Sequence, residues 1–264
     1  MERISSRRNP VVRQFRDAAA LGEDRLLLDG LHLVDEALGS GLEVELVAVA
    51  DCLAEGTRRE LVRRAGQAGA RILSVSDTVL EAISPVHRPS GVVAVARRRS
   101  AALATALATP PQLVLMLHDV QDPGNVGAII RVAEACGATG IVTGEGTAAP
   151  FGWKALRGSM GSAFRLPVAT RQPLDAALDA ARARGLRVHA AVPAGGTVLP
   201  QCDLRGPTAV LLGSEGGGLP GALVAAADEQ LTIPMRAPVD SLNVATAAAL
   251  VVYEAHRQRT AHTP

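Results

Sequence analysis

Three stretches of this 264-residue chain place Asn, Ser, Glu or several glycines where a strand ends and a helix begins. They are HDVQDPGNVGAIIRVAEACGATGI (118–141), VLLGSEGGGLPG (210–221) and DSLNVATAAALVVYEAHRQR (240–259). In open α/β sheets, ligands bind beyond the carboxyl ends of the strands, where these residues would gather. Their polar side chains could hold a ligand by hydrogen bonds, and the glycines would let backbone N–H groups approach it closely.

Each polar candidate in these stretches also has an ordinary structural explanation. Asn125 could cap the helix that follows it, and Arg131 could be a solvated side chain on that helix. Glu215 could be an exposed turn residue. Ser241 and Asn243 are residue types that commonly begin helices. Only the combination of the five along one chain favours a function over these separate explanations.

The common catalytic and binding motifs are absent from the sequence. GSEGGGLPG lacks the lysine of a phosphate-binding loop, and no G-x-G-x-x-G opens the first strand–turn–helix of either domain. Neither GSEGG nor GSMGS has the serine of a nucleophile elbow. The histidines and the three cysteines have no metal-ligand spacing, and adjacent His118 and Asp119 would point to opposite faces of a strand. We therefore expect no nucleotide-dependent kinase or dehydrogenase, no serine hydrolase and no metal site.

The elements that must position the candidates alternate between strands and helices. In the first part of the chain we expect strands at 25–30, 44–50, 71–75 and 90–98 and helices at 9–22, 31–41, 54–67 and 76–84. This alternation predicts a small α/β domain with a mainly parallel sheet over residues 1–99. Residues 100–111, SAALATALATPP, lack a strong apolar stripe and are interpreted as a linker.

The same alternation restarts after the linker. We expect strands at 112–117, 140–144, 165–169, 187–193, 208–213 and 229–234 and helices at 126–137, 153–159, 173–185, 219–227 and from Ser241 onward. Residues 112–264 are therefore predicted to form a second, larger α/β domain.

Composition restricts the class of protein further. Hydrophobic residues make up 48% of the chain, which can bury a sizeable core, and no apolar run is long enough to span a bilayer. The beginning of the sequence lacks the apolar core of a signal peptide, so we expect a cytoplasmic protein without a membrane. Net charge is +1, although arginines cluster in the first twenty residues and at 97–99. Aromatic residues are only 2%, which argues against binding single strands by base stacking.

Taken together, the three stretches resemble the signature motifs of the SpoU, or TrmH-like, RNA 2'-O-ribose methyltransferases of the SPOUT class. The motifs are carried by DVQDPGNVGAIIRVAEACGATGI (119–141), LLGSEGGGLP (211–220) and IPMRAPVDSLNVATAAALVVYE (233–254). The likeness covers essentially all of 112–258. ISSRRNPVVRQF (4–15) followed by LLLDGLHLVDEAL (26–38) resembles, more loosely, the L30e-like substrate-binding domain that often precedes the catalytic domain in this family.

The resemblance implies a fold, a cofactor and an oligomeric state. The expected catalytic domain is an α/β SPOUT domain whose C-terminal segment forms a trefoil knot, and the expected assembly is a homodimer. S-adenosylmethionine is expected to bind at Gly213, Ile233, Met235 and Leu242. The C-terminal helix, with Val244, Ala248, Val251 and Val252 on one face, could pack against a second subunit or be buried within one.

The resemblance also implies an activity for the polar candidates. Asn125, Arg131, Glu215, Ser241 and Asn243 match the active-site positions of the family. The expected reaction is methyl transfer to a ribose 2'-hydroxyl of RNA, and 23S ribosomal RNA is the expected substrate. Because a guanidinium is a poor base at neutral pH, we expect Arg131 to stabilise negative charge or clamp a phosphate.

Three alternatives stay open from the sequence alone. The chain could methylate transfer RNA instead of ribosomal RNA. It could be a non-catalytic RNA-binding assembly factor that keeps the cofactor fold, although none of the active-site residues is lost. A small-molecule methyltransferase is disfavoured, because the arginine-rich N-terminal domain suits a macromolecular substrate.

Overall fold

The computed structural model describes residues 1–20 and 24–261, which form two compact units. The first unit contains residues 1–99 and 151–165, and the second contains 100–150 and 166–264. The predicted end of the first helix at Gly22 and the last residues of the predicted catalytic domain, 262–264, lie outside the described residues. The segment 151–165, which the sequence places in the second domain, packs with the first unit.

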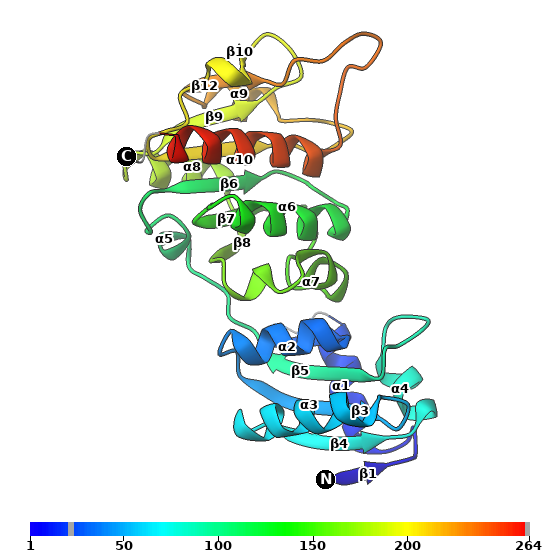
Figure 1. Cartoon of the computed structure of the whole chain (residues 1–264). Coiled ribbons are helices and arrows are strands. Elements are labelled where there is room, and N and C mark those ends of the chain that lie inside the picture. Colours follow the sequence, from blue (N-terminus) through cyan, green and yellow to red (C-terminus); the bar gives the residue numbers. More distant parts are fainter. Residues whose placement is uncertain (21–23, 262–264) are drawn as a thin grey trace. The chain divides into compact units, whose positions relative to one another are not determined.

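The first unit is built on a five-stranded sheet in the order β1-β4-β3-β5-β2 (Figure 1). Its strands are β1 (Glu2–Ile4), β2 (Arg25–Asp29), β3 (Val44–Ala50), β4 (Arg71–Val75) and β5 (Val92–Arg97). Only β5 runs against its neighbours, so the sheet is mainly parallel, as predicted. The strand sequences VELVAVA and VVAVAR are almost continuously apolar because helices cover both faces of such a sheet.

The helices of the first unit lie mostly where the sequence predicts them. They are α1 (Pro10–Ala19), α2 (Leu31–Gly39), α3 (Glu55–Gln67), α4 (Asp77–Ile83) and α7 (Trp153–Ser159), followed by the 3₁₀ turn η1 (Ser162–Phe164). Asn9 caps α1 by accepting a hydrogen bond from the backbone N–H of Val11 at 3.0 Å, and Pro10 occupies the first turn. Phe15 of α1 and Leu80 of α4 are buried in one core against the sheet.

The segment 151–165 is held in the first unit by its own contacts. Helix α7 packs against β2, and Leu156 is fully buried. Phe151 lies beneath the guanidinium of Arg98, 4.7 Å from ring centre to Cζ. Gly161 has φ 91°, and a Cβ there would lie 2.7 Å from the Cβ of Glu36, so only glycine fits this approach.

The second unit is built on a seven-stranded, entirely parallel sheet in the order β10-β12-β9-β11-β6-β7-β8. Its strands are β6 (Leu113–Leu117), β7 (Gly140–Gly144), β8 (Val168–Gln172), β9 (Arg187–Ala191), β10 (Thr197–Val198), β11 (Thr208–Leu212) and β12 (Glu229–Thr232). The chain runs outward from β6 through β7 to β8, whereas the later strands lie on the other side of β6. The order therefore reverses between β6 and β11, and such a switch point is where open parallel sheets bind ligands.

Helices cover this second sheet on both faces. They are α5 (Leu103–Ala106), α6 (Pro123–Ala135), α8 (Leu174–Arg182), α9 (Gly221–Ala225) and α10 (Val244–Thr260), with the 3₁₀ turn η2 (Leu199–Gln201). Helices α6 and α10 pack side by side (Figure 1). The C-terminal helix buries the face formed by Val244, Ala248, Val251 and Val252 within the unit. That face is therefore not available to a second subunit.

Some elements differ from their predicted bounds. The stretch 100–111 contains α5, and its Ala106 and Leu107 are fully buried in the second unit's core. A Cβ on Gly140 would lie 2.0 Å from the carbonyl oxygen of Ala106, so glycine permits this close packing. The last helix begins at Val244, because Asn243, and not Ser241, caps it. The α/β class with parallel sheets is confirmed, whereas the knot stays a prediction.

Candidate active site

Three of the five predicted polar residues meet at the carboxyl edge of the second sheet. Asn125 lies in the first turn of α6 after β6, Glu215 follows β11, and Asn243 precedes α10. The side-chain amide of Asn125 donates to Oε1 of Glu215. The amide of Asn243 donates to Oδ1 of Asn125 at 3.2 Å and to the same Glu215 oxygen at 3.4 Å. We call Asn125, Glu215 and Asn243 the amide–carboxylate network.

Helix capping fixes the orientation of this network. Oδ1 of Asn243 accepts from the backbone N–H groups of Ala245 at 3.0 Å and Thr246 at 3.3 Å. Because the oxygen of the amide is committed to α10, its NH₂ group must face Asn125 and Glu215. Capping of the helix and construction of the site are therefore one arrangement at Asn243.

The side chain of Asn125 is free for the network because another residue caps its helix. Asp122 accepts a hydrogen bond from the backbone N–H of Asn125 at 2.9 Å, and Pro123 occupies the first turn of α6. Sequence reasoning missed Asp122, although Asp followed by Pro is a standard helix start. The interpretation of Asn125 as a mere helix cap is wrong.

Arg131 is not in contact with the network. Its side chain is exposed, and it makes no hydrogen bond or ion pair with any described residue. Six residues along an α-helix amount to about 9 Å of rise and leave two side chains about 120° apart around the axis. Asn125 and Arg131 therefore lie on different faces of α6.

Ser241 also lies outside the network. Its hydroxyl donates to Oδ1 of the neighbouring Asp240 at 3.2 Å, and both residues are exposed in the loop that leads to α10. The structure thus brings together three of the five polar candidates and leaves Ser241 and Arg131 apart from them.

The positions expected to hold S-adenosylmethionine have the properties that such a group needs. Gly213 directly follows β11, and a Cβ there would lie 2.3 Å from the carbonyl carbon of Gly218, so the loop closes only around glycine. Ile233, Met235 and Leu242 are partly buried in the segment between β12 and α10. A close-packed backbone loop with apolar side chains nearby suits an adenine ring and its polar edge.

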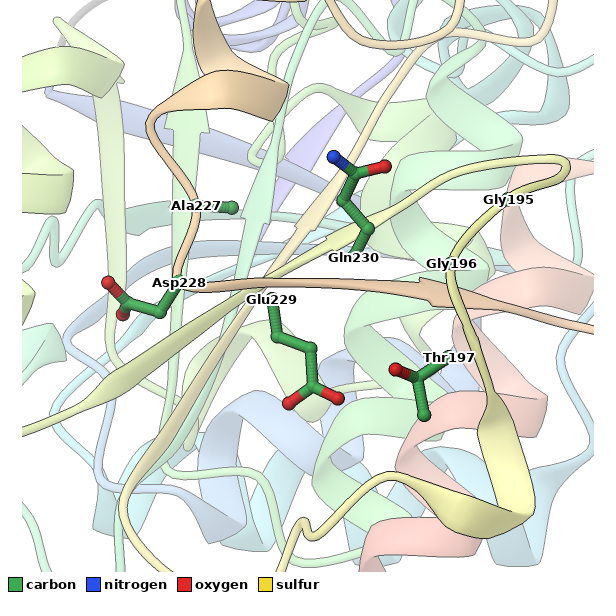
Figure 2. A pocket seen from close by; sticks show the side chains of 7 residues that line it. All are labelled: Gly195, Gly196, Thr197, Ala227, Asp228, Glu229 and Gln230. Atoms are coloured by element: carbon green, nitrogen blue, oxygen red, sulfur yellow. The ribbon is translucent and has the colours of Figure 1, made fainter.

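A separate hollow lies beside β10 and β12 (Figure 2). It is lined by Gly195, Gly196, Thr197, Ala227, Asp228, Glu229 and Gln230, and none of these is a predicted site residue. The carboxylate of Asp228 already accepts from the backbone N–H of Val188 at 2.7 Å and from Nε of Arg182 at 3.1 Å. The carboxylate thus ties the start of β12 to β9 and α8.

Over residues 1–20 and 24–261, no group of His, Cys, Asp or Glu side chains has the arrangement of a metal site. Within the same ranges, no helix is long and apolar enough to cross a membrane.

The first unit carries a different set of polar groups at the carboxyl edge of its sheet. Arg8 follows β1, and Arg88 lies in the segment that leads into β5. Asp29 is the last residue of β2, and its pKa is raised by burial and shifted in the opposite direction by Ser84 and by Arg157 of α7. Burial is the larger influence, and Asp29 accepts a hydrogen bond from the hydroxyl of Ser84 at 2.6 Å. The three arginines are exposed and form no ion pair among the described residues.

Three arginines at the opposite, amino edge of the same sheet are paired with carboxylates. Arg71 pairs with Glu2. Arg25 pairs with Glu45 at 2.9 Å, and Arg97 pairs with the same carboxylate at 3.4 Å. At the carboxyl edge Arg3 and Arg7 are paired as well, with Asp51 at 2.7 Å and Glu81 at 3.2 Å. Arg8, Arg88 and Arg157 form no ion pair among the described residues, and we call them the open arginines.

Fold and site together define a two-unit α/β protein with a ligand site at the switch point of a parallel sheet. Residues 112–253 match the model of the SpoU rRNA methylase family, and residues 13–94 match the MRM3-like substrate-binding domain. The chain is 33% identical to the 23S rRNA (guanosine-2'-O)-methyltransferase RlmP of Bacillus subtilis, over 96% of this chain and 98% of that protein.

Solved structures agree with the family match over both units. The AdoMet-bound rRNA methyltransferase of Sinorhizobium meliloti has a TM-score of 0.86 and 30% identity, and 97% of each chain is covered. The SpoU methyltransferase AviRb of Streptomyces viridochromogenes, in complex with AdoMet, has a TM-score of 0.84 and 27% identity, over 97% of this chain and all of that one. The chain belongs to the SpoU rRNA methylase family, and it is an RNA methyltransferase that uses S-adenosylmethionine.

Proposed function

We propose that the protein transfers a methyl group from S-adenosylmethionine to a ribose 2'-hydroxyl of ribosomal RNA. The observation that carries the proposal is the amide–carboxylate network at the switch point of the second sheet, next to the loops of Gly213 and Leu242. The RlmP relative, named for 2'-O-methylation of 23S rRNA, matches along 96% of the chain and supports the same target class. Such a reaction takes place in the cytoplasm of a bacterial cell, where ribosomes are assembled.

Different residues of the second unit would bind the cofactor and position the substrate. S-adenosylmethionine, when bound, supplies an electrophilic methyl carbon on a sulfonium. Gly213, Ile233, Met235 and Leu242 would hold it, and the three apolar side chains are partly buried. Asn125 and Asn243 hold the network in one arrangement and would position the 2'-hydroxyl for transfer, and correct positioning supplies much of the rate enhancement.

Arg131 acts on the RNA from a second subunit. Its exposed side chain has no partner among the described residues and lies on a different face of α6 from Asn125. A homodimer would bring Arg131 of one subunit to the network of the other. Leu250 and Tyr253, 42% and 61% exposed on α10, offer apolar surface for this contact. Sedimentation should therefore give twice the chain mass, and Leu250→Glu combined with Tyr253→Glu should give a monomer without activity.

The first unit holds the RNA through its open arginines. Arg8, Arg88 and Arg157 present exposed guanidinium groups that form no ion pair among the described residues, along one edge of the sheet. The planar fork of arginine matches phosphate oxygens, and contacts of this type position RNA without reading its sequence. The match of residues 13–94 to a substrate-binding domain supports this division.

An RNA that lacks the 2'-hydroxyl at the target nucleotide tests whether this oxygen accepts the methyl group. RNA carrying a 2'-deoxy nucleotide at the target should still bind, because binding comes from phosphate and shape contacts along the whole molecule. It should accept no methyl group from tritiated cofactor. Comparable labelling of the deoxy and ribo substrates would show that a base is methylated and would refute 2'-O transfer.

The target is found by comparing cells with and without the protein. Mapping 2'-O-methyl sites in total RNA should reveal one ribosomal position that is lost with the protein. A position lost from transfer RNA would refute the ribosomal assignment.

A further inference from the structure

We propose that Glu215 accepts the proton of the 2'-hydroxyl during methyl transfer. The inference rests on the proposed function and assigns a step that the family match leaves open. It starts from the asymmetry of the Glu215 carboxylate. Both amides of the network donate to Oε1, and no hydrogen bond from a described residue reaches Oε2.

The network holds this carboxylate in one orientation. Asn243 is fixed by the N-terminus of α10, Asn125 is fixed by Asn243, and both bind the same oxygen of Glu215. A long, exposed glutamate would otherwise sample several rotamers. Two donors on Oε1 leave Oε2 as the oxygen that can meet a substrate hydroxyl.

The amide oxygens of the network are committed. Oδ1 of Asn125 accepts from Asn243, whose own Oδ1 accepts two backbone N–H groups. Asp122 and Asp240 lie outside the network: Oδ1 of Asp122 caps α6, and Oδ1 of Asp240 accepts from the hydroxyl of Ser241. A guanidinium has only donors, so Arg131 cannot take a proton. Within the network, Glu215 is therefore the residue with an anionic oxygen that accepts no hydrogen bond from a described residue.

The chemistry suits a carboxylate. As the ribose oxygen forms its bond to the methyl carbon, the C–S bond breaks and its electron pair stays on sulfur. The attacking oxygen gains positive charge, so its O–H becomes strongly acidic and a carboxylate is a sufficient acceptor. The proton passes to Oε2 of Glu215 and then to water, because the side chain is exposed to solvent.

A 2'-amino substrate separates proton transfer from positioning. An amine attacks through its lone pair without prior loss of a proton, and the methylated ammonium product can lose one later in water. Once the methylated nucleotide is mapped, two synthetic RNAs are prepared with a hydroxyl or an amino group at that position. Single-turnover rates are then measured for the full-length protein and for Glu215→Gln, which keeps the shape of the side chain.

The expected result is selective. General base catalysis contributes on the order of 100-fold or more, so Glu215→Gln should slow the hydroxyl substrate by about that factor. The amino substrate should be slowed far less. Calorimetric affinity for S-adenosylmethionine should stay within a few fold, which verifies that the variant is folded. Glu145→Gln, the same chemical change on an exposed residue after β7, is the matched control and should leave both rates unchanged.

Two outcomes would overturn the inference. Equal slowing of both substrates would make Glu215 a positioning residue, and no slowing of the hydroxyl substrate would exclude any role in proton transfer. If Glu215→Gln lost cofactor affinity, Glu215→Asp would decide, because it keeps a carboxylate and should be faster than Gln with the hydroxyl substrate alone. Failure of the proposed function is distinguishable, since the unmodified protein would then label 2'-deoxy RNA.

Discussion

The carboxyl edges of the two sheets carry opposite chemistry. The first sheet ends in the open arginines, which have no carboxylate partners among the described residues, whereas the second ends in a network of two amides and one carboxylate. Charged groups without partners suit long-range attraction of a polyanion, and a fixed network suits the alignment of a few atoms. The difference supports the proposal that affinity for RNA and the chemical step reside in separate units. Variants should therefore be able to change one without the other.

The largest effect is expected at Arg131. Arg131→Ala should reduce the rate of methyl transfer by about 100-fold or more, because a clamp on the RNA phosphate that positions the ribose is lost. Cofactor affinity, measured by calorimetry, should stay within a few fold. Arg131→Lys should rescue poorly, because an ammonium lacks the planar fork of arginine. Full activity of the lysine variant would contradict the clamp.

Asn243 tests whether the network acts beyond helix capping. Asn243→Asp keeps a good cap but removes the NH₂ group, so stability should be retained while transfer falls by about tenfold or more. Asn243→Ala should lose methyl transfer and also stability, with a decrease of about 1 kcal/mol in the free energy of unfolding. Thermal denaturation and single-turnover rates on the two variants give the answer. An active aspartate variant would reduce Asn243 to a helix cap.

The open arginines test the other edge. Replacing Arg8, Arg88 and Arg157 by Ala should weaken RNA binding by about tenfold and reduce the salt slope of the binding constant by about two, while cofactor affinity is unchanged. Filter binding at several salt concentrations measures both quantities. The control is Ala at the paired arginines Arg25, Arg71 and Arg97, which should affect RNA binding much less. Equal losses in the two triple variants would remove the contrast between the edges of the first sheet.

The smallest effect concerns two thiols. Cys52 is exposed just after β3, at the edge where the open arginines lie, and RNA should slow its alkylation several-fold. Cys202 is buried in the second unit, and burial raises its pKa to about 11. It should stay unlabelled at pH 8 with or without RNA, because the thiolate is the reactive form. Mass spectrometry of the labelled peptides would test both expectations.

Elements with strong local signals could be predicted from the sequence. Asn9 before Pro10 marked the start of α1, and the apolar runs of the central strands marked both sheets. The meeting of Asn125, Glu215 and Asn243 followed only from the family resemblance, since strand order cannot be obtained from periodicity. The predicted starts of two helices were wrong. Asp122, and not Asn125, caps α6, and Asn243, and not Ser241, caps α10.

Tertiary packing explains the other differences. The alanine-rich stretch 100–111 lacks a stripe of large residues, yet Ala106 and Leu107 are buried because Gly140 leaves room for their backbone. Residues 151–165 carry no local sign that they belong to the first unit. Their anchors, Phe151 on Arg98 and Gly161 against Glu36, join residues more than fifty positions apart in the sequence.

The membership of residues 151–165 in the first unit sets an order of events during synthesis. A ribosome releases the chain from its N-terminus, and domains generally fold as they emerge. The first unit cannot bury β2 beneath α7 until residue 165 has left the exit tunnel, by which time β6 and β7 are already outside. The first unit is therefore completed only after the first strands of the second unit have been synthesised. A nascent chain arrested near residue 145 leaves β5 but not α7 outside the tunnel and should expose β2 to protease, whereas one arrested about 40 residues beyond Arg165 should protect it.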